Sequence, residues 1–389
     1  MESGATTGHT ASLGLIAREW TRIGLIGFGG PPAHISLLRD LVVRRYGWMD
    51  ARHFEDAISA TSLLPGPGST QLAILCAYRV GGPMGAVVGG LGFVLPAVVM
   101  VIALSVLFLS SSPPLWVRGA GAGAGAAVAA VAVRAGSELV PPSFFHAMMV
   151  HGKRFLWGAY LVAGAVAAIL IGPYLVIVLI ACGLFEVSRR TWFSRTASWS
   201  PAALLVAAAS TGGVGALAWT AFKVGALSFG GGFVIIPLMQ GDAVDVYHWM
   251  TDAQFLNAVA LGQVTPGPVV ATVAAVGYAA YGIGGGLLAA AVAFIPSFSF
   301  ILLGGGRFER LRANDRARGF LDGAGPAAIG AILGSAVTLA GALSEGWQFA
   351  VLGAAAVALL IVRLGVVETL LAAGAIGAGL ALAGASLPS

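Results

Sequence analysis

The pattern of apolar and polar positions along the chain predicts a series of hydrophobic helices. Runs such as 84–110 and 114–133 are long enough to cross a hydrocarbon core about 30 Å thick. The sequence lacks the alternating ten-residue pattern of an outer-membrane barrel, and an open sheet edge in lipid would leave its backbone groups unsatisfied. The apolar runs lie at about 11–30, 57–82, 84–110, 114–134, 155–171, 173–187, 200–230, 254–281, 284–304, 320–343, 347–363 and 365–385. We therefore expect an all-α polytopic membrane protein.

The same pattern occurs twice in this chain. Phe28-Gly29-Gly30 is followed by Phe229-Gly230-Gly231, and Pro65-Gly66-Pro67 by Pro266-Gly267-Pro268, each 201 residues later (229 − 28 and 266 − 65). Tyr and Trp residues between these motifs keep the same spacing. A duplicated apolar chain in which each copy carries a Gly/Pro-broken segment is typical of a secondary transporter with its site between the repeats.

The most polar connection, residues 186–200, predicts the boundary between the two copies. We assign residues 1–195 to an N-terminal repeat and residues 196–389 to a C-terminal repeat. The first ten residues lack the basic region of a signal peptide, so we expect no cleavage. Cys76 and Cys182 lie inside apolar runs without a metal-binding or disulfide spacing, and both are expected to be small buried residues.

Loop charge predicts that the two copies are inserted upside down relative to each other. Lys and Arg near the ends of membrane spans stay on the cytoplasmic side. The loop at 39–52 carries four arginines, whereas its counterpart at 240–253 carries three aspartates and no Lys or Arg. Farther along the bias reverses, because 110–113 is uncharged and the matching loop at 305–319 carries five arginines. Two independent loop pairs therefore indicate inverted-topology repeats.

This topology requires residues 57–82 to enter and leave on the same side of the membrane. Pro-Gly-Pro would mark the tip of a re-entrant hairpin, because Pro65 disfavours helix before it and Pro67 fits a first helical turn. Residues 254–281 would form the same hairpin from the opposite face. The alternative is that each segment spans the membrane with a kink, which would give more crossings and a different loop assignment.

Composition narrows the class of protein. Only 10% of the 389 residues are charged and 58% are hydrophobic, whereas soluble domains carry roughly 25% charged residues. The net charge of +5 comes mostly from loop arginines beside hydrophobic spans, so no nucleic-acid partner is expected. The sequence has no Walker loop, no His/Cys metal spacing and no nucleophile–base set. We expect no enzyme, no cofactor and no metal, and hence secondary or facilitated transport.

The broken segments are the candidate binding site. Non-helical backbone at membrane depth is tolerated where it is buried or lines a cavity. Half-helices that begin after Pro67 and Pro268 would point unpaired N–H groups at mid-membrane, which favours an anion. The predicted site comprises Phe28, Gly29, Gly30, Phe229, Gly230, Gly231, Pro65, Gly66, Pro67, Ser69, Thr70, Gln71, Pro266, Gly267, Pro268 and Thr272. The alternative is that the small polar residues merely cap kinked helices.

Arg22 and Lys223 are predicted to supply positive charge to this site. Each lies inside a hydrophobic stretch shortly before a Phe-Gly-Gly motif, where a cation costs roughly 2.5 to 3.5 kcal/mol on insertion scales. Two cations at one repeat position suit a dianion. Alternatively, Arg22 pairs with Glu19 or reaches an interface, and Lys223 likewise reaches a surface. No carboxylate in the spans falls inside the predicted site.

The motifs, taken in order, resemble the long two-domain type of the chromate ion transporter family. The resemblance covers nearly the whole chain and rests on both copies of Phe-Gly-Gly and Pro-Gly-Pro together with Phe93-Val94-Leu95-Pro96 and Phe294-Ile295-Pro296. The chain departs from the family pattern at Gln71, where some members carry Glu, and Thr272 stands opposite Gln71 in the second copy.

The resemblance implies a multi-pass carrier in the inner membrane that binds chromate or a sulfate-like oxyanion, with chromate efflux as its role. We expect alternating access between the inverted halves within the lipid bilayer. The sequence is compatible with a homodimer. The alternative functions are an anion channel and an integral-membrane enzyme acting on an anionic lipid.

Overall fold

The computed structural model describes residues 11–62, 64–110, 112–151, 154–191, 213–228, 233–304 and 314–388. Every regular element in these ranges is helical. The first copy contains α1 (Leu13–Ile26), α2 (Pro31–Arg39), η1 (Asp40–Arg45), α3 (Ala51–Thr61), α4 (Gly68–Phe108), α5 (Leu115–His151), α6 (Arg154–Leu170), η2 (Gly172–Tyr174) and α7 (Leu175–Thr191). The second contains α9 (Val214–Leu227), α10 (Ile235–Gln240), η4 (Gly241–Val246), α11 (Asp252–Val264), η5 (Val269–Thr272), α12 (Val273–Gly304), α14 (Asp315–Gly341), α15 (Gly346–Ala356), η7 (Val357–Val362) and α16 (Val366–Leu382).

The described residues include four helices long and apolar enough to cross a membrane. They are Gly68–Phe108, Leu115–Met149, Val269–Gly304 and Arg318–Gly341. Together with the shorter apolar helices around them, they make the protein an all-α, multi-pass membrane protein, as the sequence predicts.

The duplication extends to local irregularities of the backbone. A π-helix follows α2 at Asp40–Arg45, and another follows α10 at Gly241–Val246. Each is followed by a stacked aromatic pair, Tyr46 on Trp48 with ring centroids 4.3 Å apart and Tyr247 on Trp249 at 4.7 Å. Because π-helices are rare, their recurrence at one repeat position supports a shared local fold in the two copies.

The helices α4 and α12 each contain a sharp turn, and the spacing between the copies changes there. Gly82 has φ 63° and Gly282 has φ 62°, values that suit glycine. These two residues are 200 apart (282 − 82), although the half-helices begin after prolines 201 apart (268 − 67). The second copy is therefore one residue shorter between Pro-Gly-Pro and the turn.

After the turn the chain runs back along itself. A Cβ placed on Gly85 would lie 2.5 Å from the Ala77 carbonyl oxygen, and one placed on Gly277 would lie 2.3 Å from the Gly285 oxygen. The segment 68–80 is consequently a separate half-helix of about 20 Å, too short to cross a hydrocarbon core of about 30 Å.

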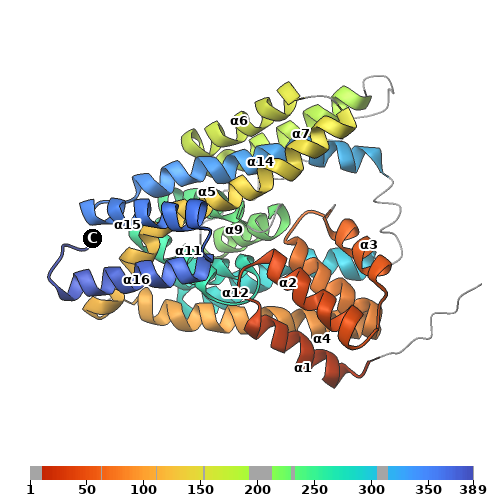
Figure 1. Cartoon of the computed structure of the whole chain (residues 1–389), viewed down its shortest axis with the longest axis horizontal. Coiled ribbons are helices and arrows are strands. Elements are labelled where there is room, and N and C mark those ends of the chain that lie inside the picture. Colours follow the sequence, from red (N-terminus) through yellow and green to blue (C-terminus); the bar gives the residue numbers. More distant parts are fainter. Residues whose placement is uncertain are drawn as a thin grey trace, which may run out of the picture.

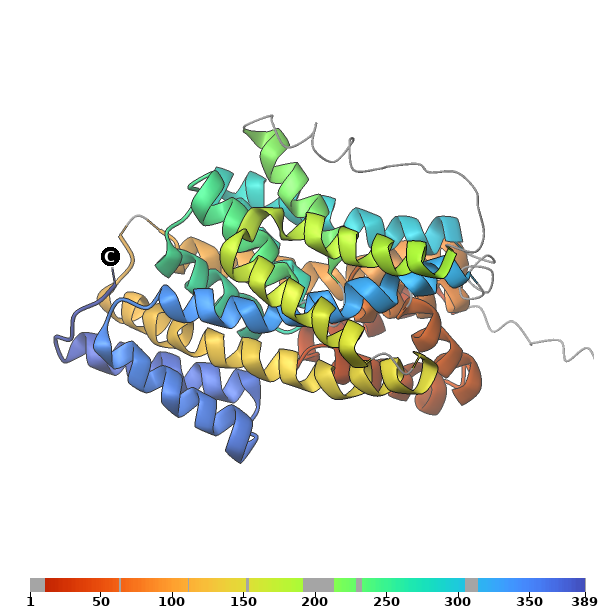
Figure 2. The same ribbon diagram turned by 90° about the horizontal axis from the view of Figure 1, so that it is seen from above.

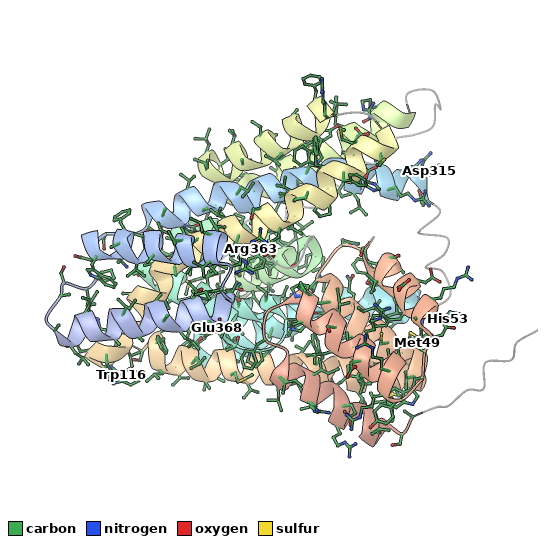
Figure 3. All side chains as sticks on the ribbon, in the orientation of Figure 1. Met49, His53, Trp116, Asp315, Arg363 and Glu368 are labelled. Carbon is green, nitrogen blue, oxygen red and sulfur yellow. The ribbon has the colours of Figure 1, made fainter. Side chains whose placement is uncertain are left out.

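This half-helix and α3 form the predicted hairpin. At its open end, Arg79 near the end of the half-helix donates to the His53 carbonyl at the start of α3, with Nη1 and O 2.8 Å apart. Pro-Gly-Pro lies at the opposite end of both helices. His53 and Met49, which also contacts Arg79, lie at one end of the molecule in Figure 3. The hairpin is confirmed and the single kinked span is not found.

Equivalent helices of the two copies run antiparallel. A Cβ on Gly90 of α4 would meet Phe298 of α12, and one on Gly286 would meet Ile102, so residue numbers rise along α4 as they fall along α12. The same holds for α5 and α14, where His146 pairs with Asp322 at 3.5 Å and Gly136 approaches Leu333. Figure 1 shows these long helices stretching across the molecule. The antiparallel pairs match the predicted inverted repeats.

The two copies also interlock. The helix α5 packs along α16 and α15 of the second copy, while α14 packs along α6 and α7 of the first. Figure 2 shows α16 lying beside the first part of α5. Glycines permit the close approach, since a Cβ on Gly123 would lie 2.2 Å from the Ala373 carbonyl oxygen. The predicted repeat boundary near residue 195 lies outside the described residues and stays a prediction.

Inversion makes a direct labelling prediction for one exposed position at the start of each hairpin. Arg52 and Asp252 both lie in the first turn of a hairpin helix, and both are exposed, whereas Cys76 and Cys182 are buried. We expect Arg52→Cys to react with a membrane-impermeant maleimide from the cytoplasmic side and Asp252→Cys from the opposite side. Labelling of both from one side would contradict the inverted topology.

Candidate functional site

The tip of the second hairpin is bonded to the break at the end of α1. The Gly267 N–H donates to the Gly27 carbonyl oxygen at 3.0 Å. The same oxygen accepts from Nε2 of His34 at 2.9 Å. A single carbonyl thus joins the second Pro-Gly-Pro motif to the first copy.

His34 links the Gly27 carbonyl to the first half-helix. Because its Nε2 faces a carbonyl, Nε2 bears the proton and Nδ1 accepts from the Ser69 hydroxyl at 3.2 Å. The ring is fully buried and packs edge-on against Phe93, with centroids 5.0 Å apart. His34 is therefore held as a neutral bridge between α1 and the half-helix that follows Pro67.

Both Pro-Gly-Pro glycines meet backbone of the opposite copy, which explains why glycine is required there. Gly66 has φ +116° and Gly267 has φ +98°. A Cβ on Gly66 would lie 3.1 Å from the Gly225 oxygen, and one on Gly267 would lie 3.5 Å from the Gly24 oxygen. Since Gly24 and Gly225 are equivalent positions, the two tips make reciprocal contacts around a pseudo-two-fold axis.

A pocket of about 320 Å³ lies at the first tip. Gly66, Gly68 and Ser69 line it, together with apolar residues of α2, α3 and α14. The first N–H groups of a helix have no acceptor within the helix, and Pro67 at the N-cap supplies no side-chain acceptor. These donors and the positive end of the half-helix dipole favour an anion at this pocket.

Buried polar side chains without a hydrogen-bond partner among the described residues occur in both copies, and two of these residues, Gln71 and Ser297, lie against the first tip. Thr70 Oγ1, Gln71 Oε1, Ser228 Oγ and Ser297 Oγ are buried and have no hydrogen-bond partner among the described residues. Gln71 donates Nε2 to the Pro65 carbonyl at 2.7 Å, which places its amide against the tip. Ser297 Oγ would lie 3.5 Å from a Cβ on Gly66. Each orphan group costs about 1 to 3 kcal/mol unless a ligand pairs with it.

The second half-helix has different side chains in its first turn. Its first turn presents Val269 and Val270, and the Thr272 hydroxyl donates to the Val269 carbonyl within the same turn at 2.6 Å. Thr272 is also packed against Gly262. Ser69 and Thr70 of the first half-helix thus have no side-chain counterpart in the second, and Thr272, the side-chain donor predicted there, is bonded within its own turn.

Arg22 lies in an ion-pair cluster around Glu19. Its side chain is 57% exposed and its Nη1 is 3.7 Å from Glu19. The buried Glu19 carboxylate also contacts Arg18 at 2.9 Å, Arg45 at 3.2 Å and the Tyr46 hydroxyl at 3.2 Å. The structure thus has the Arg22–Glu19 pair that the sequence leaves open as an alternative. A role for Arg22 as a site charge stays a prediction.

Lys223 is buried and paired with a carboxylate that the sequence analysis places in a loop. Its Nζ lies 2.5 Å from Oδ2 of Asp242, which also accepts from the Thr220 hydroxyl at 2.6 Å. Lys223 and Asp242 are 8% and 5% exposed. The expectation that Asp242 is a loop charge, with no carboxylate near the site, is wrong. The apolar residues before Asp242, from Ile235 onward, are the signal that indicates its burial.

The Phe-Gly-Gly motif of the first copy provides the break between α1 and α2. Gly29 has φ 97° and Gly30 has φ 73°, so both use conformations that suit glycine. The Phe28 side chain is 47% exposed and faces the surroundings of the protein. Phe229, Gly230 and Gly231 lie outside the described residues.

The tip pocket connects to one end of the molecule. A larger cavity of about 440 Å³ shares Ser62, Leu321 and Gly325 with it and extends to His146 and Asp322. Asp315 and His53 lie at this end in Figure 3, while Trp116 lies at the other end. A separate polar cavity of about 490 Å³, lined by Arg118 among others, lies near that far end.

Known proteins match the chain along its length. The family model described as chromate transporter matches residues 15–187 and 215–380. A chromate transport protein of Cupriavidus metallidurans is 33% identical over 384 residues, covering 96% of this chain and 94% of the relative. One from Pseudomonas aeruginosa is 32% identical over 388 residues, with coverage of 93% and 91%. An uncharacterized transporter of Methanocaldococcus jannaschii is 26% identical over 354 residues, with coverage of 86% and 85%. No solved structure matches the chain.

The orphan hydroxyl of Ser297 predicts an unusual effect on stability. Because it has no partner to lose, Ser297→Ala should leave the free energy of unfolding unchanged or raise it by up to about 1 kcal/mol. Ser105 on α4 is the matched control, since it is also fully buried but donates to the Val101 carbonyl at 2.8 Å. Thermal unfolding in detergent should show a loss for Ser105→Ala alone. Equal destabilisation by both variants would contradict a ligand role for Ser297.

Proposed function

Because this chain belongs to the chromate transporter family, we propose that it is a secondary transporter of chromate and of related divalent tetrahedral oxyanions such as sulfate. The observation that carries the proposal is the pocket at the first Pro-Gly-Pro tip. The first residues of the half-helix, Gly68 and Ser69, line it, and the buried hydroxyls of Thr70 and Ser297 have no hydrogen-bond partner among the described residues. Half-helix N-termini at mid-membrane bind the anionic groups of substrates in other carriers.

Lys223 would supply the positive charge for a dianion. It lies two residues before Gly225, whose carbonyl faces Gly66 of the pocket. A charge-assisted hydrogen bond from an ammonium to an oxyanion contributes about 1.5 to 3 kcal/mol. Arg22 occupies the equivalent position in the first copy, where three other side chains already surround its carboxylate partner.

Alternating access would exchange the contacts of the two tips. The bond from Gly267 to the Gly27 carbonyl has no counterpart at Gly66 among the described residues. Inverted copies can exchange their conformations, so that the first tip gains this bond and closes while the second tip loses it and opens. This motion would carry a bound anion from one side of the membrane to the other.

The position of the open cavity supports efflux. The tip pocket connects to the end that carries Asp322 and the arginines Arg316 and Arg318, which the positive-inside rule assigns to the cytoplasm. An anion would therefore enter from the cytoplasm. A membrane potential that is negative inside favours its exit by about 2.3 kcal/mol per charge at 100 mV.

Uptake of labelled chromate into everted membrane vesicles tests the function directly. We expect uptake that saturates, that excess sulfate reduces, and that an imposed potential of the correct sign accelerates. Currents without saturation or exchange would instead indicate a channel.

Substitution of the two repeat-related cations separates their roles. Lys223→Gln should lower chromate uptake by roughly 10- to 100-fold, because it removes the positive charge that the proposal assigns to the dianion. Arg22→Gln should lower it by less than about fivefold, since an exposed ion pair contributes little. Both variants must be present in the membrane at wild-type amounts. Unchanged uptake by Lys223→Gln would exclude the charge assignment.

A further inference from the structure

The two copies surround their buried carboxylates with different cations. In the first copy, Glu19 contacts Arg18, Arg22 and Arg45, so the cluster carries a net positive charge. In the second, Asp242 is paired with Lys223, and these two charges cancel. Arginine stays protonated in proteins, whereas buried ammonium and carboxylate groups change protonation readily. Displacement of one cation in the second copy therefore leaves its carboxylate without a cation, whereas two arginines would remain in the first.

The surroundings of Asp242 leave it dependent on Lys223. From α9 it faces Lys223 and the Thr220 hydroxyl. Tyr247 lies near it just beyond the π-helix, where burial, and then the charge of Asp242, raise the pKa of the phenol. Tyr174 of η2 also raises the pKa of Tyr247. Burial, and then the charge of Asp252, raise the pKa of Asp245 in the same π-helix. No second cation contacts Asp242 among the described residues.

A carboxylate that is 5% exposed cannot remain charged at low cost once its cation leaves. Removing one partner of a buried ion pair is strongly destabilising if the remaining charge stays. Protonation of the carboxylate removes that charge, and the Thr220 hydroxyl can still hydrogen-bond to the neutral acid. Any ligand that draws Lys223 away from Asp242 should therefore drive a proton onto Asp242.

We propose that Asp242 is a proton-binding site coupled to the anion through Lys223. The inference rests on the proposed transport of a dianion. When the anion binds, the Lys223 ammonium moves from Oδ2 of Asp242 to an oxygen of the anion, and one proton from water binds Oδ2. When the anion leaves, the ion pair forms again and the same proton is released. One proton then travels with each dianion, and the charge carried per cycle falls from two to one.

Lys223 lies on the helix that contacts the first tip. Lys223 precedes Gly225 by two residues on α9, and Gly225 meets Gly66 of the pocket. Ser228, with its unpartnered hydroxyl, continues the same stretch toward the second Phe-Gly-Gly motif. Linkage requires the effect to be reciprocal, so protonation of Asp242 must strengthen anion binding.

Proton uptake on chromate binding tests the coupling. The full-length protein is purified in detergent, held in weak buffer at alkaline pH where chromate remains a dianion, and mixed with chromate in the presence of a pH indicator. Chromate binding is measured in parallel by equilibrium dialysis. We expect about one proton taken up per bound anion, and affinity that rises by up to about tenfold per unit fall in pH.

Three variants assign the proton to its site. Asp242→Asn should abolish the uptake, and Asp242→Glu should retain it with a shifted pH dependence. Asp245→Asn is the matched control on the same π-helix and should behave as wild type. The proton equilibrium of chromate itself is common to all samples and cancels between them.

The outcomes separate this inference from the proposed function. Chromate binding without proton uptake by the wild-type protein overturns the coupling and leaves the transporter intact, as does equal uptake by Asp242→Asn and wild type. Absence of chromate or sulfate binding and transport in the wild-type protein overturns the proposed function, and the coupling with it. If Asp242→Asn does not fold, the proposal is tested by two other results: proton uptake by the wild-type protein, and a shifted pH dependence of proton uptake in Asp242→Glu.

Discussion

The contact between each Pro-Gly-Pro tip and the backbone of the opposite copy is the constraint on which the rest of the structure depends. Gly66 and Gly267 have backbone conformations that suit glycine, and neither site has room for a side chain. The Gly27 carbonyl binds one tip directly and, through His34, the half-helix of the other. Because these bonds link both hairpins to α1, movement of one tip must displace the break in α1.

Local patterns in the sequence were sufficient for the fold. Pro-Gly-Pro positions the hairpin tips because proline restricts the residues beside it, and loop arginines specify orientation through the membrane. Partners across the fold were not predictable in this way. The sequence predicts Asp242 to be a loop charge, because only tertiary packing brings it to Lys223. Ser297 lies in an apolar run, and nothing in the sequence indicates that it packs beside Gly66. Burial of Phe28 could not be judged from its motif, and the side chain faces outward.

The copies share a backbone but have diverged in the side chains that determine chemistry. Ser69 and Thr70 in one half-helix correspond to Val270 and Ala271 in the other. A binding site for one small anion needs only one set of donors, and a second set would leave further polar groups without partners for much of a transport cycle. The inverted repeat can thus supply symmetric motion while a single tip supplies recognition.

The packing of α5 along α16 has a consequence for biogenesis. The ribosome releases α5 into the membrane long before α16 exists, and α14, its other long neighbour, also belongs to the second copy. Until then the glycine-rich face of α5, including Gly119 and Gly123, has only lipid or a temporary partner against it. The N-terminal half therefore cannot finish folding on its own, and the protein should depend on insertase or chaperone contacts that shield this face during translation.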